Sequence, residues 1–89
     1  MSAPTDDDHL MTLIERIAQR DEVALKALYD LTARKLYGLS LRVVGSAEAA
    51  EDALQETFVQ VWRTAGDYRA SLSPPMAWLG LIVRSRSLD

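Results

Sequence analysis

The feature that most constrains the fold is the spacing of apolar residues between positions 47 and 65. Apolar or small side chains return there every three or four positions, which places them on one face of an α-helix. In chain order, this face comprises Ala50, Ala53, Leu54, Thr57, Phe58, Val61, Trp62 and Ala65. No stretch of the chain alternates apolar and polar residues with the period of two that a β-strand requires. The chain is therefore expected to be all-α.

The same spacing predicts three other helices, so the expected architecture is a compact bundle of about four helices. A short helix starts at Leu10 and ends near Arg20. Residues 1–9 before it lack apolar periodicity and contain three consecutive aspartates, so we expect a disordered leader there. A long helix follows over about 22–44. Its inner face comprises Leu25, Leu28, Leu36, Leu39 and Val43, with Leu31 and Thr32 bridging the gap between Leu28 and Leu36.

Residues with capping preferences mark where these helices begin and end. Asp21 suits the N-cap of the long helix, because its carboxylate can accept hydrogen bonds from the unpaired N–H groups of the first turn. Gly45 suits the left-handed position that ends this helix, and Ser46 suits the next N-cap. Ser73 is expected to cap the last helix, whose first turn tolerates the two prolines that follow.

The last helix is expected to bury Trp78, Leu81 and Ile82. No helix-stopping residue precedes Asp89, so we expect the natural protein to continue past this point. A chain of 89 residues has room for one domain, which we assign to residues 10–89.

Composition argues against catalytic and membrane functions. The chain has no cysteine, and its one histidine, His9, lies in the expected leader, so neither thiol chemistry nor a metal site is predicted. The carboxylates of residues 48–56 lie along one helix, without the enclosed site that shifts carboxyl pKa values for acid–base catalysis. The longest apolar run, 76–83, is far shorter than the roughly 20 residues of a membrane span. We expect a cytoplasmic protein that is not an enzyme and needs no cofactor.

A second face of the predicted 47–65 helix carries a regular pattern that core packing does not require. Five residues recur there at three- and four-residue spacing, opposite much of the apolar face: Asp52, Gln55, Glu56, Val59 and Arg63. Val59 is an apolar residue in a polar field, which favours contact with a partner. An ordinary solvated surface explains the pattern equally well, so periodicity leaves both interpretations open.

Cations, hydroxyls and aromatic rings gather in the 68–75 loop and in the last helix. This mixture is typical of single-stranded nucleic acid binding, because guanidinium groups bind phosphates and aromatic faces stack on bases. The candidate residues are Tyr68, Arg69, Ser71, Ser73, Arg84 and Arg86. The alternative interpretation buries Tyr68 and Trp78 in the core and leaves the arginines in solvent.

Charge limits the extent of any nucleic-acid surface. The formal net charge is −3, and residues 1–60 carry eleven acidic against six basic side chains. Residues 61–89 carry four arginines against two aspartates. A short basic patch late in the chain is therefore compatible with the sequence, whereas a uniformly basic surface is not.

Residues 49–63 resemble the most recognisable segment of bacterial sigma factors of the extracytoplasmic-function (ECF) class. That segment reads roughly Ala-Glu-Asp-x-x-Gln-Glu-Thr-Phe-x-x-x-Trp, and Asp52, Gln55, Glu56, Phe58 and Trp62 match it. Residues 20–29 resemble the start of the first helices of this class. Residues 78–89 resemble its Trp-Leu-x-x-Ile-Ala-Arg-Asn-x-x-Leu-Asp stretch. The resemblance covers about residues 10–89 and points to sigma region 2.

The resemblance implies a domain that binds core RNA polymerase and opens the minus-ten promoter element. The five residues of the second face would contact the clamp helices of the polymerase β′ subunit, with Phe58 and Trp62 in the core. The 68–75 loop would help to capture a base flipped from the non-template strand. The helix that carries Arg84 and Arg86 would approach the promoter.

Relatives of this class also imply features that this sequence does not contain or does not match. A region 4 domain that reads the minus-thirty-five element would follow Asp89, and an anti-sigma factor would cover the polymerase- and DNA-facing surfaces. The chain departs from the pattern at Ser85 and Ser87, where Asn and Ala are usual, and in its two loop prolines. Together with the acidic balance, the Ser85 departure leaves an alternative open: a helical protein-interaction module, an adaptor or decoy, without DNA contact.

Overall fold

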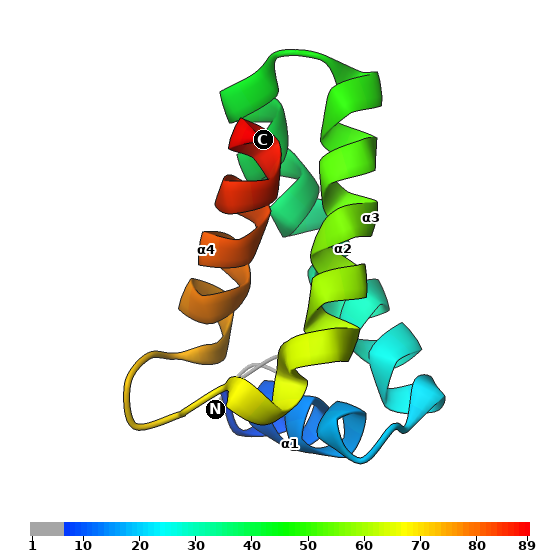
Figure 1. Ribbon diagram of the computed structural model, residues 1–89, viewed down its shortest axis with the longest axis vertical. Helices are drawn as coiled ribbons and strands as arrows, with labels where there is room; N and C mark the ends of the chain where they lie inside the picture. The colour runs from blue at the N-terminus through cyan, green and yellow to red at the C-terminus, as the bar shows by residue number, and fades with distance from the viewer. Residues whose placement is uncertain (1–6) are drawn as a thin grey trace, which may run out of the picture.

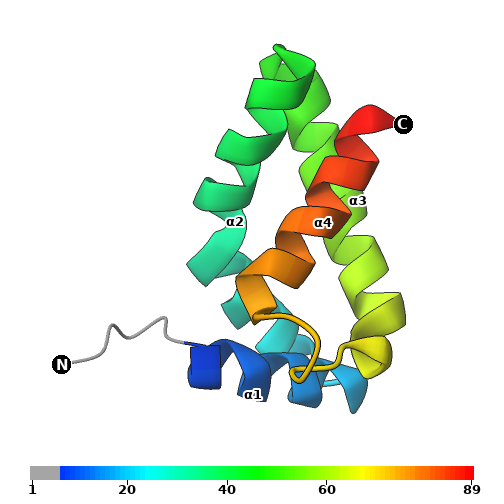
Figure 2. The same ribbon diagram turned by 90° about the vertical axis from the view of Figure 1, so that its left-hand side faces the viewer.

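A computed structural model describes residues 7–89, and these form four α-helices and one 3₁₀ turn without any strand. The elements are α1 (Asp7–Ala18), α2 (Glu22–Val44), α3 (Ala47–Thr64), η1 (Ala65–Asp67) and α4 (Pro75–Leu88). Helices α2, α3 and α4 pack against one another, and α1 crosses their lower end (Figures 1 and 2). The expected all-α bundle is confirmed.

The first helix begins earlier than the sequence pattern predicts. Asp7, Asp8 and His9 form the first turn of α1, so they do not belong to a disordered leader. Carboxylates are favoured in this turn, because they lie near the positive end of the helix dipole. The remainder of the expected leader, residues 1–6, lies outside the described residues.

Three of the four predicted caps are confirmed. The Asp21 carboxylate accepts hydrogen bonds from the backbone N–H groups of Val23 and Ala24. Gly45 ends α2 with a φ of 73°, and the Ser46 hydroxyl accepts from the N–H of Ala49 at 3.3 Å. The fourth prediction, that Ser73 caps α4, is wrong.

Pro74, rather than Ser73, occupies the N-cap position of α4, and Pro75 is the first helical residue. Because Pro75 lacks an N–H group, the first turn of α4 has one donor fewer to satisfy. Ser73 lies one position before the N-cap and two before the first helical residue. The residue before a proline is also restricted to extended backbone, which keeps Ser73 out of the helix.

The buried stripe of α2 differs from the predicted one. Buried residues recur strictly every four positions, and three of the five are small: Ala24, Leu28, Thr32, Leu36 and Ser40. Three leucine or valine residues that the pattern suggested for the interior or its edge are exposed: Leu31, Leu39 and Val43. Leu25 is half-buried.

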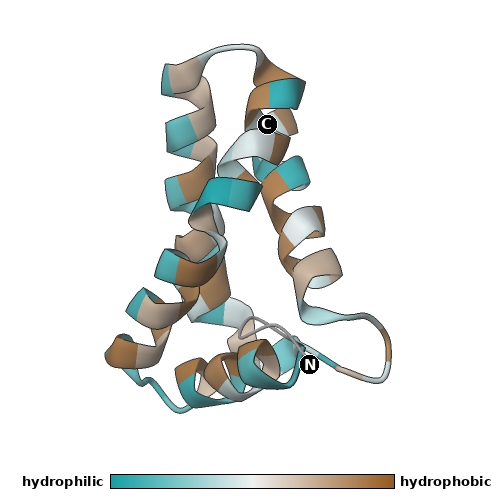
Figure 3. Cartoon of the chain, turned by 180° about the vertical axis from the view of Figure 1, so that it is seen from behind, coloured by the Kyte–Doolittle hydropathy of each residue, from teal (hydrophilic) through white to brown (hydrophobic). Residues whose placement is uncertain are grey.

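The buried face of α4 also differs from the predicted one. Leu79, Ile82 and Val83 are buried, Trp78 is half-buried, and Leu81 is 65% exposed. Because the 76–83 run is apolar on every side, its pattern could not specify which face turns inward. Much of α4 is coloured as hydrophobic in Figure 3.

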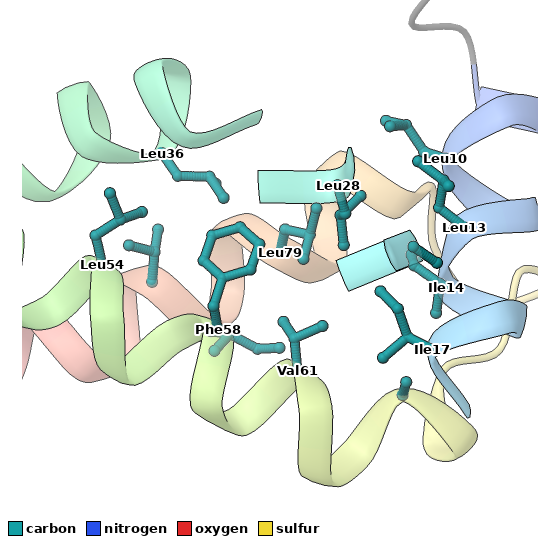
Figure 4. Close-up of a cluster of buried hydrophobic side chains, with 14 residues drawn as sticks. Leu10, Leu13, Ile14, Ile17, Leu28, Leu36, Leu54, Phe58, Val61 and Leu79 are labelled. Carbon is teal, nitrogen blue, oxygen red and sulfur yellow. The ribbon is translucent and has the colours of Figure 1, made fainter. Parts of the chain in front are cut away.

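One continuous core joins all four α-helices. Leu10, Ile14 and Ile17 of α1 close its lower end, and Leu36 and Leu54 lie at the other end (Figure 4). The predicted inner face of α3 is confirmed, with Trp62 half-buried at its edge. The core therefore fixes α3 by one face and leaves its opposite face exposed to solvent.

Candidate functional site

The second face of α3 is exposed along its whole length. All five predicted residues are exposed: Asp52, Gln55, Glu56, Val59 and Arg63. Val59 is 50% exposed. Within residues 7–89, none of the four polar side chains in this set makes a hydrogen bond or an ion pair. Their polar groups are therefore available to a partner.

An apolar groove runs between α2 and α3, beside this face, with a volume of about 740 Å³. Val59 and Gln55 line it, whereas Asp52, Glu56 and Arg63 lie outside its lining. The full lining is Glu22, Leu25, Lys26 and Tyr29 from α2 and Gln55, Phe58, Val59 and Trp62 from α3. The structure thus joins part of the predicted face to residues of α2.

Tyr29 and Phe58 line this groove as an aromatic pair. Their ring centroids are 5.0 Å apart with an interplanar angle of 66°, which is the edge-to-face geometry that aromatic pairs favour. Phe58 is buried, whereas Tyr29 is 41% exposed. Sequence reasoning placed Phe58 in the core but missed Tyr29. An aromatic residue four positions after Leu25 was the available signal, because that spacing puts both side chains on one side of α2.

Beyond Gln55, the groove continues into a more polar hollow of about 560 Å³. Tyr29 and Gln55 line both cavities, and Arg34 and Glu51 line only the second. Charged side chains of both signs therefore line each cavity, Glu22 and Lys26 in the first and Arg34 and Glu51 in the second, but the first is the more apolar.

The 68–75 loop is held by its own side chains. The Tyr68 hydroxyl donates a hydrogen bond to the Ser73 carbonyl at 2.8 Å, and its ring lies 5.1 Å from the Trp78 ring. Burial, with a smaller contribution from the negative charge of Asp7, raises the pKa of Tyr68 above its ordinary value of 10.0. The hydroxyl therefore stays protonated and remains a donor at neutral pH.

Of the remaining polar residues of the loop, Arg69 is hydrogen-bonded within the chain and Ser71 is exposed. Arg69 donates from Nη1 to the carbonyls of Gly66 at 2.9 Å and Tyr68 at 3.1 Å, so its guanidinium braces the chain after α3. Ser71 is exposed, and Ser73 is half-buried. Leu72, which sequence reasoning did not select, is 82% exposed. No periodicity in the loop could have identified it.

The two arginines of α4 differ in their surroundings. Arg84 is exposed and, within the described part of the chain, makes no ion pair. Arg86 is half-buried and pairs with the Asp89 carboxylate at 2.9 Å. Ser85 is exposed. The Ser87 hydroxyl is not available, because it donates to the Val83 carbonyl and contacts the Ser40 hydroxyl, both at 2.6 Å.

The structure separates the predicted nucleic-acid residues into two groups. Figure 2 shows the loop at the lower end of the bundle beside α1, whereas the C-terminal end of α4 lies at the upper end. Arg84 follows Pro75 by nine residues, which corresponds to roughly 14 Å along the helix axis. Any nucleic acid that contacts both groups must follow α4 along its length.

Neither a metal centre nor a membrane span is found between residues 7 and 89. No three His, Asp or Glu side chains in this range gather as ligands for a metal ion. None of the described helices combines the length and apolar character required to cross a bilayer. The features that need explanation are therefore the groove, the second face of α3, the loop and α4.

Comparison with known proteins gives consistent matches. Residues 28–89 match the sequence model of the family described as Sigma-70 region 2. The chain is 38% identical over 86 residues to the ECF RNA polymerase sigma factor SigK of Mycobacterium ulcerans (strain Agy99), covering 97% of this chain and 46% of that protein. For the protein of the same name from Mycobacterium sp. (strain KMS), identity is 39% over 80 residues, covering 90% and 42%. The chain thus spans slightly less than half the length of these relatives.

Proposed function

The chain belongs to the Sigma-70 region 2 family, and we propose that it binds core RNA polymerase and promoter DNA through two different surfaces. The observation that carries the proposal is the apolar groove beside a helix face whose polar side chains have no partner in residues 7–89. A surface with this anatomy, apolar at its centre and polar at its rim, is typical of protein–protein interfaces.

The polymerase contact uses the second face of α3 together with the groove. The proposed residues are Asp52, Gln55, Glu56, Val59 and Arg63, and the proposed partner is the pair of β′ clamp helices. Tyr29 and Trp62 extend this surface onto the groove, where a side chain of an inserted helix can lose its water. The carboxylates of Asp52 and Glu56 flank the apolar part, which favours basic residues on the partner.

The DNA contact uses the loop and α4. The proposed ligand is the non-template strand of the minus-ten element, and the proposed residues are Tyr68, Arg69, Ser71, Ser73, Arg84 and Arg86. Tyr68 acts mainly by shaping the loop, because its hydroxyl is bonded to Ser73. Ser71 and Arg84 are exposed, so they can contact bases and phosphates directly. A loop already held in shape loses less conformational entropy when it captures a flipped base.

Regulation and location follow from the same proposal. An anti-sigma factor that covers the groove or α4 would block one of the two contacts, and the cytoplasm is where both polymerase and promoter are found. The proposed activity is binding and strand separation, so neither a catalytic residue nor a cofactor has a part in it.

The decisive experiment measures binding of this domain to an isolated β′ clamp-helix fragment. The Gln55→Ala/Glu56→Ala variant should bind at least about tenfold more weakly, with an unchanged helical circular dichroism signal, because both side chains are exposed. A matched control changes the same residue types away from this surface, Glu15→Ala on α1 and Gln19→Ala in the turn after it, and should bind like the wild type. Wild-type affinity in the first variant contradicts the assigned surface.

A second measurement, of binding to single-stranded minus-ten DNA, decides between the proposed function and the alternative of a protein-interaction module. A domain that binds the β′ fragment and also binds single-stranded minus-ten DNA supports the full proposal. A domain that binds the fragment but shows no DNA binding, even as part of a polymerase complex, supports the adaptor or decoy.

A further inference from the structure

The corner between α1 and α2 contains a residue in an unfavourable backbone conformation. Arg20 has a φ of 67°, and between residues 7 and 89 it is the only non-glycine residue with a positive φ. Its N–H donates to the Ile17 carbonyl at 2.8 Å, and the next N–H, of Asp21, donates to the Arg16 carbonyl at 3.1 Å. This is the Schellman ending of a helix, in which glycine is the usual residue at the left-handed position.

The side chain of Arg20 reaches the far end of α3. Its Nη1 donates a hydrogen bond to the backbone carbonyl of Trp62 at 2.6 Å, across 42 positions of sequence. That carbonyl belongs to the last turn of α3, where carbonyls lack partners within the helix. The guanidinium carbon also lies 5.0 Å from the centroid of the Trp62 ring, within the range of a cation–π contact.

Trp62 is a wall of the groove between α2 and α3, whereas Arg20 does not line it. One guanidinium therefore holds both the backbone and the ring of a groove residue from outside the groove. Glycine would satisfy the Schellman backbone with less strain, so the contribution of arginine at this position comes from its side chain. We infer that Arg20 is a positioning residue that fixes the orientation of Trp62 and thereby the shape of the groove.

The inference rests on the proposed function only for the identity of the groove's partner. Its first test needs no partner: the indole N–H resonance of Trp62 in a ¹⁵N NMR spectrum, assigned by its loss in Trp62→Phe. In Arg20→Gly the Trp62 indole resonance should shift and the order parameter of its N–H should fall. The Trp78 indole resonance should stay in place. An unchanged Trp62 resonance overturns the inference, whatever happens to binding.

The melting temperature separates positioning from simple stabilisation. Arg20→Gly should melt close to the wild type, because relief of the left-handed strain offsets the lost side-chain contacts. It should nevertheless bind the β′ clamp-helix fragment about three- to tenfold more weakly, and Arg20→Lys, which keeps the cation, should lie between the two. Wild-type affinity in Arg20→Gly overturns a role in shaping the groove.

A double-mutant cycle excludes direct contact between Arg20 and the partner. If Arg20 acts through the indole, Arg20→Gly has no further effect on affinity in a Trp62→Ala background. An equal loss in both backgrounds means that Arg20 touches the partner itself, and this overturns the positioning role. If the wild-type domain does not bind the fragment at all, the proposed function fails, and the indole resonance alone decides the inference.

Discussion

The groove between α2 and α3 and the 68–75 loop are both exposed, but they use their polar groups in opposite ways. At the groove, Gln55 and the flanking Glu56 make no hydrogen bond within the described residues. In the loop, Tyr68 and Arg69 are bonded to nearby backbone carbonyls. The groove is thus ready for a partner as it stands, whereas the loop has used much of its bonding capacity to hold its own shape.

This difference teaches that exposure and availability are separate properties. Arg69 and Glu56 are both exposed, yet a ligand must compete with two carbonyls for the Arg69 guanidinium. We therefore expect changes in the groove to affect binding directly. Changes in the loop should act first on its conformation and stability.

The largest effect should come from the core that both surfaces share. Leu79→Ala removes a fully buried side chain of α4 and should cost about 2–5 kcal/mol of unfolding free energy. For a domain of this size the melting temperature should fall by roughly 10 °C or more, and both binding activities should weaken. The matched control is Leu81→Ala on the same helix, 65% exposed, which should melt nearly like the wild type. Equal destabilisation by the two changes contradicts the observed face of α4.

A charge introduced into the groove should weaken polymerase binding without affecting DNA binding. Val59→Glu should weaken binding to the β′ fragment at least about tenfold, because a carboxylate in an apolar contact loses its hydration. Stability should hardly change, since Val59 is half-exposed, and DNA binding should be unaffected. Val23→Glu is the control: Val23 is 73% exposed on α2 and does not line the groove. If both variants bind equally weakly, net charge rather than the groove determines affinity.

In the loop, removal of one hydroxyl should show whether shape or contact matters. Tyr68→Phe keeps the ring against Trp78 but loses the hydrogen bond to Ser73, which should cost about 1 kcal/mol and lower the melting temperature. Binding of single-stranded minus-ten DNA should weaken, with no change at the β′ fragment. Tyr37→Phe provides the control, because the Tyr37 hydroxyl makes no hydrogen bond in the described part of the chain. An unaltered melting temperature in Tyr68→Phe rules out the bracing role.

The smallest effect should appear in the salt dependence of DNA binding. Arg84→Ala should reduce the slope of log K against log salt by about 0.7 for one lost phosphate contact. Arg86→Ala should change the slope less, because its guanidinium is paired with Asp89. Arg34→Ala, on the α2–α3 side, is the control and should leave the slope as it is. A slope that responds equally to all three changes indicates non-specific charge attraction.

The sequence predicted the fold and the helix ends better than the buried faces. Asp21, Gly45 and Ser46 could be predicted because capping depends on the chemistry of single residues. The predicted stripe of α2 was correct at Leu28, Thr32 and Leu36 but missed Ser40. Ser40 is polar by type but satisfied when buried, because its hydroxyl contacts that of Ser87, just as the Thr32 hydroxyl donates to the Leu28 carbonyl. Hydrophobicity counts cannot recognise a hydroxyl that finds its partner one helical turn away or on another helix.

The candidate site was predictable on α3 and incomplete elsewhere. The positions of the apolar residues on α3 determine which side of the helix is buried. The exposure of the opposite side, which carries the second face, could therefore be predicted. The contributions of Leu25 and Tyr29 depend on how α2 lies against α3, which one-dimensional spacing does not contain. The use of Arg69 as a brace depends on the path of the chain after α3, which the pattern left as an undefined loop.

The corner at Asp21 has a consequence for how chain length can vary in this domain. The N–H of Asp21 completes the end of α1, its carboxylate starts α2, and the same carboxylate pairs with Arg16 at 2.8 Å. One residue thus completes the end of α1 and caps the start of α2, so no flexible linker separates the two helices. A single inserted residue there would turn α2 by about 100° about its own axis and swing Ala24, Leu28 and Leu36 off the core. We therefore expect this corner to tolerate insertions and deletions poorly.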